Sequence, residues 1–207
     1  MMKEIRTSIS EDYPEIYFIE GQRDGKYPYS HSILFRDTLI DTGISSGFLR
    51  KLKRKAEINN VILSHWHEDH IAGNRLLPDA SFMAHQDDVP VIEDVSKMYE
   101  YYHVKDHPDQ MELFQSILEG LRLEDTTINT MISDRDVIRI YDFYHLQVIH
   151  TPGHTKGHCC FYEKKSKIAF LADIDLSSLG PWYGGADSNV MEFEQSIKKV
   201  QKFDIEI

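Results

Sequence analysis

The sequence predicts a layered α/β fold, in which each half of the chain runs from strands to a helix. The first half has this order in strand-like and helical patterns at 15–20, 32–35, 38–40 and 45–58. The second half repeats it at 137–140, 146–149, 158–162, 168–171 and 189–203. A cluster of histidines and acidic residues directly follows the apolar run 61–64. Ligands of α/β proteins often bind beyond strand ends, so the position of this cluster agrees with the fold class.

Local signals justify the elements of the first half. The loop 21–25 begins and ends with glycine, and residues 36–37 form the turn of a predicted hairpin. The pattern at 45–58 places apolar residues on one side and basic residues on the other, as in an amphipathic helix. A short helix at 71–77 and a strand at 81–84 are expected after the cluster.

Residues 86–125 lack strand signals and predict a helical insertion that covers the site. Apolar residues between Met111 and Leu121 recur at helical spacing, which is typical of core packing. The neighbouring Tyr99, Tyr101 and Tyr102 either line a substrate pocket or pack internally or against a second copy in a homodimer. The sequence leaves these interpretations open. Further along, Asn189 and Glu192 have the spacing of a capping box at the start of the final helix.

The stretch His65-Trp66-His67-Glu68-Asp69-His70 is the most informative part of the chain. Few structural needs place three histidines and an aspartate within six positions. Neutral imidazole binds zinc, copper, iron and nickel, and a carboxylate adds oxygen coordination. The pattern therefore predicts a metal site.

This stretch resembles the H-x-H-x-D-H element of the metallo-β-lactamase superfamily. Three further motifs of that family are similar and stand in the expected order, at Asp41-Thr42-Gly43, Thr151-Pro152-Gly153-His154-Thr155-Lys156-Gly157-His158 and Leu171-Ala172-Asp173. The resemblance covers nearly the whole chain. It implies an αββα sandwich of two mixed sheets flanked by helices, formed by a single domain over residues 1–207. The glyoxalase II-like and lactonase-like branches look most similar.

The resemblance also implies the roles of the site residues. His65, His67 and His154 would bind one ion, Asp69 and His70 a second, and Asp173 would bridge both. The implied cofactor is zinc, as two ions, with iron as the alternative. A metal-bound hydroxide would attack an ester, thioester, lactone or amide carbonyl of a small molecule. Asp69 would also relay the proton, and Asp41 would support catalysis by holding a ligand in place.

A fifth family motif, a histidine on a strand near the C-terminus, is absent, because no histidine follows Asp173. The end 203–207 looks like the opening of the strand that would carry it. Either the chain is truncated there, or the second metal site is built differently. Asp175 is an outside candidate for the second ion, and His158 is expected to be structural. In the glycine-containing loop 180–185, Trp182 forms either a pocket wall or a packed anchor.

Two other functions remain open from the sequence. Persulfide dioxygenases resemble this family and hold a single iron with two histidines and an aspartate, here His65, His154 and Asp173. The missing motif makes such a one-metal oxidoreductase credible. The third interpretation is an incomplete, non-enzymatic metal-binding domain. Metal identity separates the first two functions, and loss of metal without loss of fold would favour the third.

Composition limits the partners. The net charge of −11 argues against nucleic acid, whose binding needs clustered lysine and arginine. No segment approaches the ~18 apolar residues of a membrane span, and residues 1–10 show no secretory signal, so a cytoplasmic location without membrane contact is expected. Cys159 and Cys160 are adjacent and are expected to be buried, reduced thiols.

Overall fold

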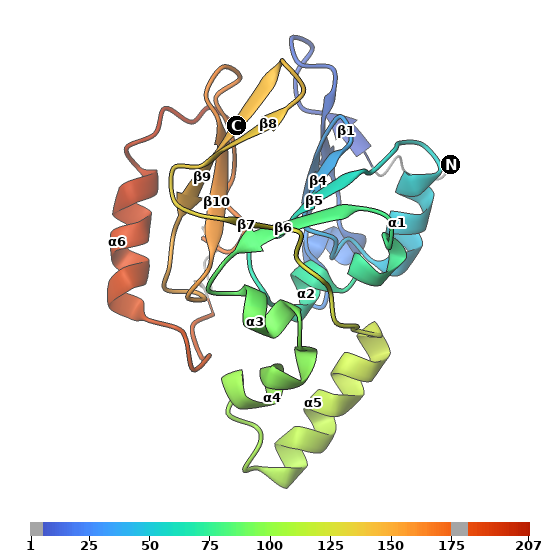
Figure 1. The fold of residues 1–207 in the computed structure, drawn as a ribbon, viewed down its shortest axis with the longest axis vertical. Helices are drawn as coiled ribbons and strands as arrows, with labels where there is room; N and C mark the ends of the chain where they lie inside the picture. Colours follow the sequence, from blue (N-terminus) through green and yellow to red (C-terminus); the bar gives the residue numbers. More distant parts are fainter. Residues whose placement is uncertain (1–5, 175–181) are drawn as a thin grey trace.

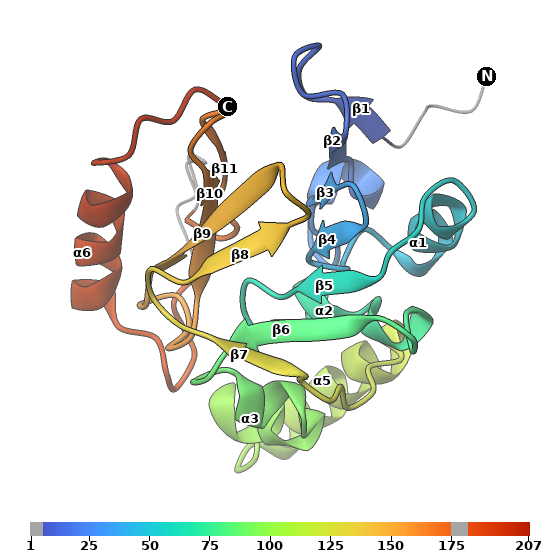
Figure 2. The same ribbon diagram turned by 45° about the horizontal axis from the view of Figure 1, so that its top comes forward.

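The computed structural model describes residues 6–174 and 182–207, and these form two β-sheets that face each other. Helix α1 (Ser46–Lys53) lies on the outer side of the first sheet, and helix α6 (Val190–Val200) lies on the outer side of the second (Figures 1 and 2). The αββα sandwich predicted from the sequence is therefore confirmed.

The first sheet of the described chain has seven strands in the order β1-β2-β3-β4-β5-β6-β7. Their bounds are Arg6–Ser8, Ile16–Ile19, Ser32–Phe35, Thr38–Ile40, Asn60–Ile62, Ser81–His85 and Thr130–Ile132. Strands β1 to β4 pair antiparallel, whereas β4 to β7 pair parallel. The switch occurs where α1 crosses over from β4 to β5, because parallel neighbours need a long connection. This sheet is mixed, as expected.

The second sheet has four strands in the order β11-β10-β9-β8 within the described residues. Their bounds are Val137–Ile140 (β8), Tyr144–His150 (β9), Cys159–Glu163 (β10) and Ile168–Phe170 (β11). All its pairs are antiparallel, so the expectation of two mixed sheets is wrong for this one. The reason is that its strands follow one another through short loops, and such loops join antiparallel neighbours.

The predicted insertion is helical. It contains α3 (Val89–Ile92), a 3₁₀ turn η3 (Val95–Lys97), α4 (Met98–Tyr101) and α5 (Pro108–Leu121), which lie together beyond β6 and β7 (Figure 1). Helix α5 begins with proline, whose fixed φ suits a first helical turn, and ends where Arg122 adopts a left-handed φ of 56°. Its buried residues Phe114 and Leu118 join the core outside the first sheet.

Three hydrophobic cores hold the layers together. One fills the space between the sheets and is built around Phe35, Ile62, Val148 and Phe161. A second lies between the first sheet and its helices, and a third joins the second sheet to α6. No helix in the described ranges is long and apolar enough to cross a membrane.

Several boundaries differ from the sequence prediction. Helix α1 ends at Lys53, earlier than the predicted 58, since residues 54–59 turn back to bring β5 beside β4. Strands β1 and β7 were not predicted, because each is only three residues long and too short to show an alternating apolar pattern. Residues 203–207 form no regular strand, yet they run along β11, where the Ala169 amide donates to the Ile207 carbonyl at 2.8 Å.

The remaining short elements are the 3₁₀ turns η1 (Gln22–Gly25) and η2 (Asn74–Leu76) and the single helical turn α2 (Glu68–Ile71). The final helix begins as predicted, because the Asn189 side chain accepts hydrogen bonds from the amides of Met191 and Glu192. Segments that follow β5, β9 and β11 carry the predicted ligands, and Asp41, predicted to support them, follows β4.

Candidate metal centre

The loop after β5 positions the first ligands. His65 and His67 lie in the short segment between β5 and α2, and Asp69 and His70 lie on α2 itself. Gly43 packs against this turn so closely that an added Cβ would lie 1.5 Å from the Asp69 carbonyl oxygen. The first motif and the histidine stretch are therefore one packed unit, and position 43 has no room for a side chain.

Four predicted ligands converge from both sheets. One possible ligand atom from each of His65, His67, His154 and Asp173 lies within 4.8 Å of the others. His65 Nε2 and His67 Nδ1 are 3.0 Å apart, and His154 Nε2 lies 3.2 Å from Asp173 Oδ2. Two nitrogens that bind one tetrahedral zinc ion at 2.0–2.1 Å lie about 3.3 Å apart. The spacing of the two imidazoles is close to that value.

Asp173 also faces the remaining predicted ligands. Its Oδ1 lies 2.9 Å from His70 Nε2, while its Oδ2 faces His154. Asp69 Oδ2 lies 3.9 Å from the same nitrogen of His70. The Asp173 carboxylate thus lies between two groups of predicted ligands. The first group is His65, His67 and His154, and the second is Asp69 and His70.

Asp41 holds this centre from behind. Its side chain is fully buried and accepts hydrogen bonds from the Ser64 amide at 2.7 Å, the Ser64 hydroxyl at 2.6 Å and His70 Nδ1 at 2.7 Å. The carboxylate fixes a proton on His70 Nδ1, so that Nε2, which points to Asp173, is the nitrogen that would release its proton and bind a metal. Asp41 therefore acts on the site through Ser64 and His70.

Three supporting contacts could not be predicted from the sequence. The Trp182 carbonyl accepts from His154 Nδ1 at 2.6 Å, and Ser64 Oγ lies 2.9 Å from His65 Nδ1. Glu68, which is buried, accepts hydrogen bonds from the Tyr27 and Tyr102 hydroxyls at 2.8 Å and 2.5 Å. The contacts of Trp182 and Glu68 join segments distant in the sequence, so no local pattern marks them. Ser64 directly precedes His65, but a serine before a histidine does not by itself indicate this contact.

Burial and charge set the protonation of the ligands. Burial lowers the pKa of His65 and of His67 well below the usual value, so both rings are neutral, the form that binds metals. Burial opposes the charge on His70 too, but the surrounding Asp173, Asp41 and Asp69 raise its pKa well above the usual value. Burial raises the pKa of Asp69 to about 7, although His70 favours its ionised form.

The donor set fits a metal ion. The buried His154 Nε2 makes no hydrogen bond, and two other imidazole nitrogens, His65 Nε2 and His67 Nδ1, face each other at 3.0 Å. Imidazoles gathered around an acidic side chain are typical ligands of zinc or non-haem iron. A cation at their centre would satisfy groups that the protein alone leaves unpaired.

Other predicted candidates have different surroundings. His158 lies among the ligands, but its Nδ1 faces the Thr151 hydroxyl at 2.8 Å and its Nε2 accepts from the Asp173 amide at 3.2 Å. Burial and the neighbouring His154 lower the pKa of His158 to about 3, so it is a neutral support for Asp173. Asp175 lies outside the described residues.

A second group of potential ligands consists of His85, Asp87 and His150. The two rings stack with centroids 4.0 Å apart and planes 8° from parallel, and His150 Nε2 lies 2.9 Å from the Lys156 carbonyl oxygen. The lone pairs of parallel rings do not converge on one point. This arrangement favours packing over metal binding.

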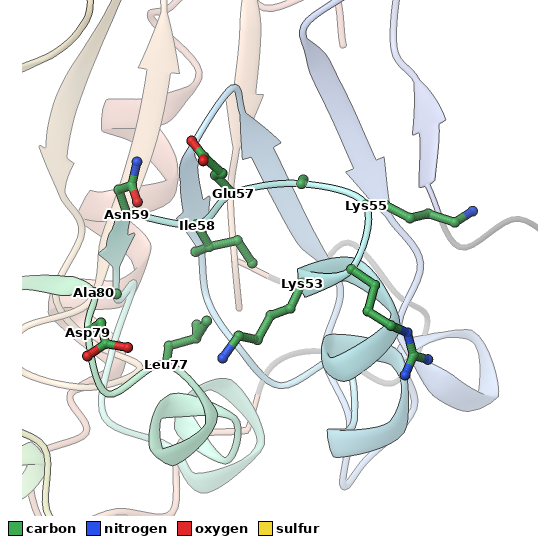
Figure 3. Close-up of a pocket in the computed structure, with 10 residues that line it drawn as sticks. Lys53, Lys55, Glu57, Ile58, Asn59, Leu77, Asp79 and Ala80 are labelled. Atoms are coloured by element: carbon green, nitrogen blue, oxygen red, sulfur yellow. The ribbon is translucent and has the colours of Figure 1, made fainter.

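A cavity of about 460 Å³ lies next to the residues that precede β5, at the opposite end of this strand from the metal centre. Figure 3 shows the side chains around it. Residues 53–59 and 77–80 line it, and none of the predicted ligands does. Cys159 and Cys160 are buried free thiols, and burial raises the pKa of Cys160 to about 12, so neither carries the chemistry.

Comparison with known proteins agrees with this geometry. Residues 30–207 match the family model of the metallo-beta-lactamase superfamily. An uncharacterised protein of Aquifex aeolicus is 26% identical over 173 residues, which cover 78% of this chain and 70% of that protein. A hydroxyacylglutathione hydrolase of Francisella philomiragia is 24% identical, over 81% of this chain and 53% of that protein. An atrochrysone carboxyl ACP thioesterase of Aspergillus fumigatus is 26% identical, over 79% of this chain and 42% of that protein. The chain thus spans about half the length of these two named relatives.

Solved structures share the fold. The metallo-beta-lactamase FEZ-1 of Legionella gormanii superposes with a TM-score of 0.66 at 18% identity, covering 93% of this chain and 74% of that one. TTHA1623 in a di-iron-bound form superposes with a TM-score of 0.62 at 19% identity, covering 95% of this chain and 85% of that one. With the family model matched over most of its length and the ligand motifs assembled at one centre, the chain belongs to the metallo-β-lactamase superfamily.

Proposed function

We propose that this protein is a metal-dependent hydrolase that adds water to the carbonyl carbon of a small-molecule ester, thioester, lactone or amide and breaks its bond to the leaving oxygen, sulfur or nitrogen. The observation that carries the proposal is the position of Asp173, whose two oxygens face His154 on one side and His70 on the other. A carboxylate between two sets of ligands suits a pair of ions, with zinc as the proposed metal. His65, His67 and His154 would hold one ion, and Asp69 and His70 the other, with Asp173 shared.

The ions, when bound, would supply the Lewis acidity that lowers the pKa of water and polarises the substrate carbonyl. The protein's own groups would do the rest. His65 and His67 would remain neutral ligands, because burial disfavours their charged form. The Trp182 carbonyl accepts from His154 Nδ1, which leaves His154 Nε2 as the nitrogen that would bind the ion. Asp69, with a side chain 17% exposed, would accept and pass on the proton at the open side of the site.

Aromatic side chains would contact the substrate next to the ligands. The rings of Tyr102 and Trp182 lie 5.8 Å and 5.3 Å from that of His67, centroid to centroid, and Trp182 is 47% exposed. Tyr102 comes from the helical insertion, which connects this insertion to the site. Partly exposed aromatic faces beside a polar centre are common in small-molecule sites.

A thioester is the first substrate class to test. Two relatives carry the names of a hydroxyacylglutathione hydrolase and an acyl carrier protein thioesterase. Esters, lactones and amides require the same attack on a carbonyl carbon and remain in the substrate panel. These activities belong to the named relatives, and they support the proposal for this chain only as a class of chemistry.

The test measures hydrolysis of short acyl thioesters, esters, lactones and amides by the zinc-loaded protein. The His154→Ala variant removes a proposed ligand, and His145→Ala on the exposed side of β9 is the matched control. We expect turnover that is lost in His154→Ala and kept in His145→Ala. Hydrolysis that both variants retain would reject this site, and no hydrolysis of any class by a zinc-loaded protein would reject the function.

One observation favours a second candidate. His65, His154 and Asp173 form a set of two histidines and one carboxylate, which is also the ligand set of mononuclear non-haem iron oxygenases. A persulfide dioxygenase activity would then replace hydrolysis. Stoichiometric iron in the purified protein, with oxygen consumption on a persulfide substrate, would favour this candidate. Zinc in the same protein without oxygen consumption would exclude it.

A further inference from the structure

Asp88 lies outside every predicted ligand motif, yet it joins the two loops that carry the ligands. Its side chain is fully buried at the start of α3. Oδ2 accepts hydrogen bonds from the Trp66 amide at 3.1 Å and the Thr155 hydroxyl at 2.9 Å, and Oδ1 accepts from the Gly157 amide at 2.7 Å. Trp66 stands between His65 and His67, while Thr155 follows His154. A single carboxylate therefore binds both ligand loops.

Asp187 makes a similar connection from the segment before α6. Its Oδ2 accepts from the Trp66 indole nitrogen at 3.0 Å and from the Lys156 amide at 3.0 Å. Two carboxylates from separate parts of the chain thus connect Trp66 with the stretch 155–157. Among the described residues, the hydrogen bonds of the Asp88 and Asp187 side chains go to Trp66 and to residues 155–157, and not to a proposed ligand side chain.

The two loops belong to different sheets. The loop with His65 and His67 follows β5 of the first sheet, whereas His154 lies between β9 and β10 of the second. Sheets that face each other pack through side chains, so no strand ladder fixes the distance between these ligands. A backbone bond from the Cys159 amide to the Ser64 carbonyl at 2.9 Å is a further link between the loops.

We propose that Asp88 is a positioning residue that sets the distance between the His65 and His67 pair and His154, with Asp187 as its second support. Metal affinity depends on how closely the empty ligand set matches the bound geometry. Supporting groups around metal ligands typically change affinity 10–100-fold when they are replaced. The inference concerns metal binding, so it does not depend on the hydrolase assignment.

The Asp88→Asn variant tests this directly. An amide has one acceptor oxygen, so its NH₂ group must face the amide hydrogen of either Gly157 or Trp66. In the first orientation the stretch 155–157 keeps only the Thr155 hydroxyl bond to this side chain, and in the second the Trp66 amide loses its acceptor, although the side chain keeps its size. We expect the dissociation constant for zinc, measured by competition with a chromophoric chelator, to rise at least about tenfold. The visible spectrum of the cobalt-substituted protein should change as well.

Gly157→Ala perturbs the same contact from the other loop. A Cβ at Gly157 would lie 2.4 Å from Asp88 Oδ1, so the carboxylate and the loop must separate. We expect the same weakening of zinc affinity and the same spectral change. Gly120→Ala is the matched control, because a Cβ there meets nothing within 4 Å. Asp94→Asn is the control for charge, since the side chain of Asp94 is 46% exposed and bonds to Ser96 and Lys97 on the insertion.

The outcomes separate positioning from a general role in folding. Weakened zinc affinity and an altered cobalt spectrum in both test variants, with both controls unchanged, would support the proposal. If Asp88→Asn lowers the melting temperature of the metal-free protein but leaves zinc affinity and the cobalt spectrum unchanged, the proposal fails. Should Asp88→Asn not fold, Gly157→Ala and Thr155→Val decide in its place, since Thr155→Val removes one donor alone. Affinity within about twofold of the parent in both would overturn it.

Discussion

Replacing Asp41 by asparagine should remove the metal ion proposed at His70. In the parent protein Asp41 accepts from the Ser64 amide and hydroxyl and from His70 Nδ1. With the amide oxygen toward the Ser64 amide, the NH₂ group faces His70 Nδ1. The ring can then accept only by moving its proton to Nε2, the nitrogen 2.9 Å from Asp173 that should bind the ion.

The opposite orientation of the amide also has a cost. The NH₂ group would then face the Ser64 amide hydrogen, leaving a buried donor unpaired at about 1–3 kcal/mol. Because Asp41 is 0% exposed, water cannot replace the lost partner. We therefore expect affinity for the second ion to fall about 10–100-fold, with a loss of stability of at most about 3 kcal/mol.

Metal titration followed by elemental analysis measures this effect. The parent should bind two zinc ions, and Asp41→Asn should keep one tight site and lose the other at micromolar free zinc. Asp79→Asn, on the exposed surface, removes the same charge and should behave as the parent. Two ions bound by Asp41→Asn with parental affinity and parental melting temperature would refute the role assigned to Asp41.

The other predictions concern the core, acid stability, the aromatic wall and metal removal. Phe161→Ala should lower the free energy of unfolding in urea by about 3–5 kcal/mol, because Phe161 lies between the sheets and is 0% exposed. Phe143 is 61% exposed, so Phe143→Ala should lower it by less than about 0.5 kcal/mol. Equal losses in the two variants would contradict the packing. Burial, together with His150, lowers the pKa of His85 to about 4. Between pH 6.5 and about 4, His85 therefore binds a proton in the unfolded chain but not in the folded protein. Folding stability should fall as the pH drops through this range. In His85→Phe, chemical unfolding across this pH range should show a shallower decline, and an unchanged slope would reject the assignment. Trp182→Ala should raise KM without weakening zinc binding, because the backbone carbonyl of Trp182, and not its ring, accepts the hydrogen bond from His154. A loss of zinc in this variant would show that the ring also supports the metal site. Chelation should abolish hydrolysis while circular dichroism changes little, and added zinc should restore activity; loss of the far-ultraviolet spectrum would show that the metal also holds the fold.

The sequence predicted the ligand loops because their signals are local. An apolar strand followed by closely spaced histidines describes β5 and its loop without reference to the rest of the chain. The hairpin of β3 and β4 and the cap at Asn189 are local in the same sense. Such elements depend on neighbours within a few residues, and periodicity and capping patterns describe those neighbours.

The roles of Asp88 and Asp187 could not be predicted, since they arise from contacts between distant segments. Asp88 meets Gly157 across 69 positions, and Trp66 meets Asp187 across 121. An aspartate after a strand carries no sign of such partners. The edge strands β1 and β7 were missed for another reason, because an exposed edge needs no apolar alternation.

Metal identity and count per chain, measured by elemental analysis of protein purified without chelator, tests the central claim most directly. We predict close to two zinc ions, consistent with Asp173 facing ligands on both sides. A single iron per chain would contradict the two-zinc hydrolase and favour the dioxygenase. A folded chain that binds no metal would contradict both.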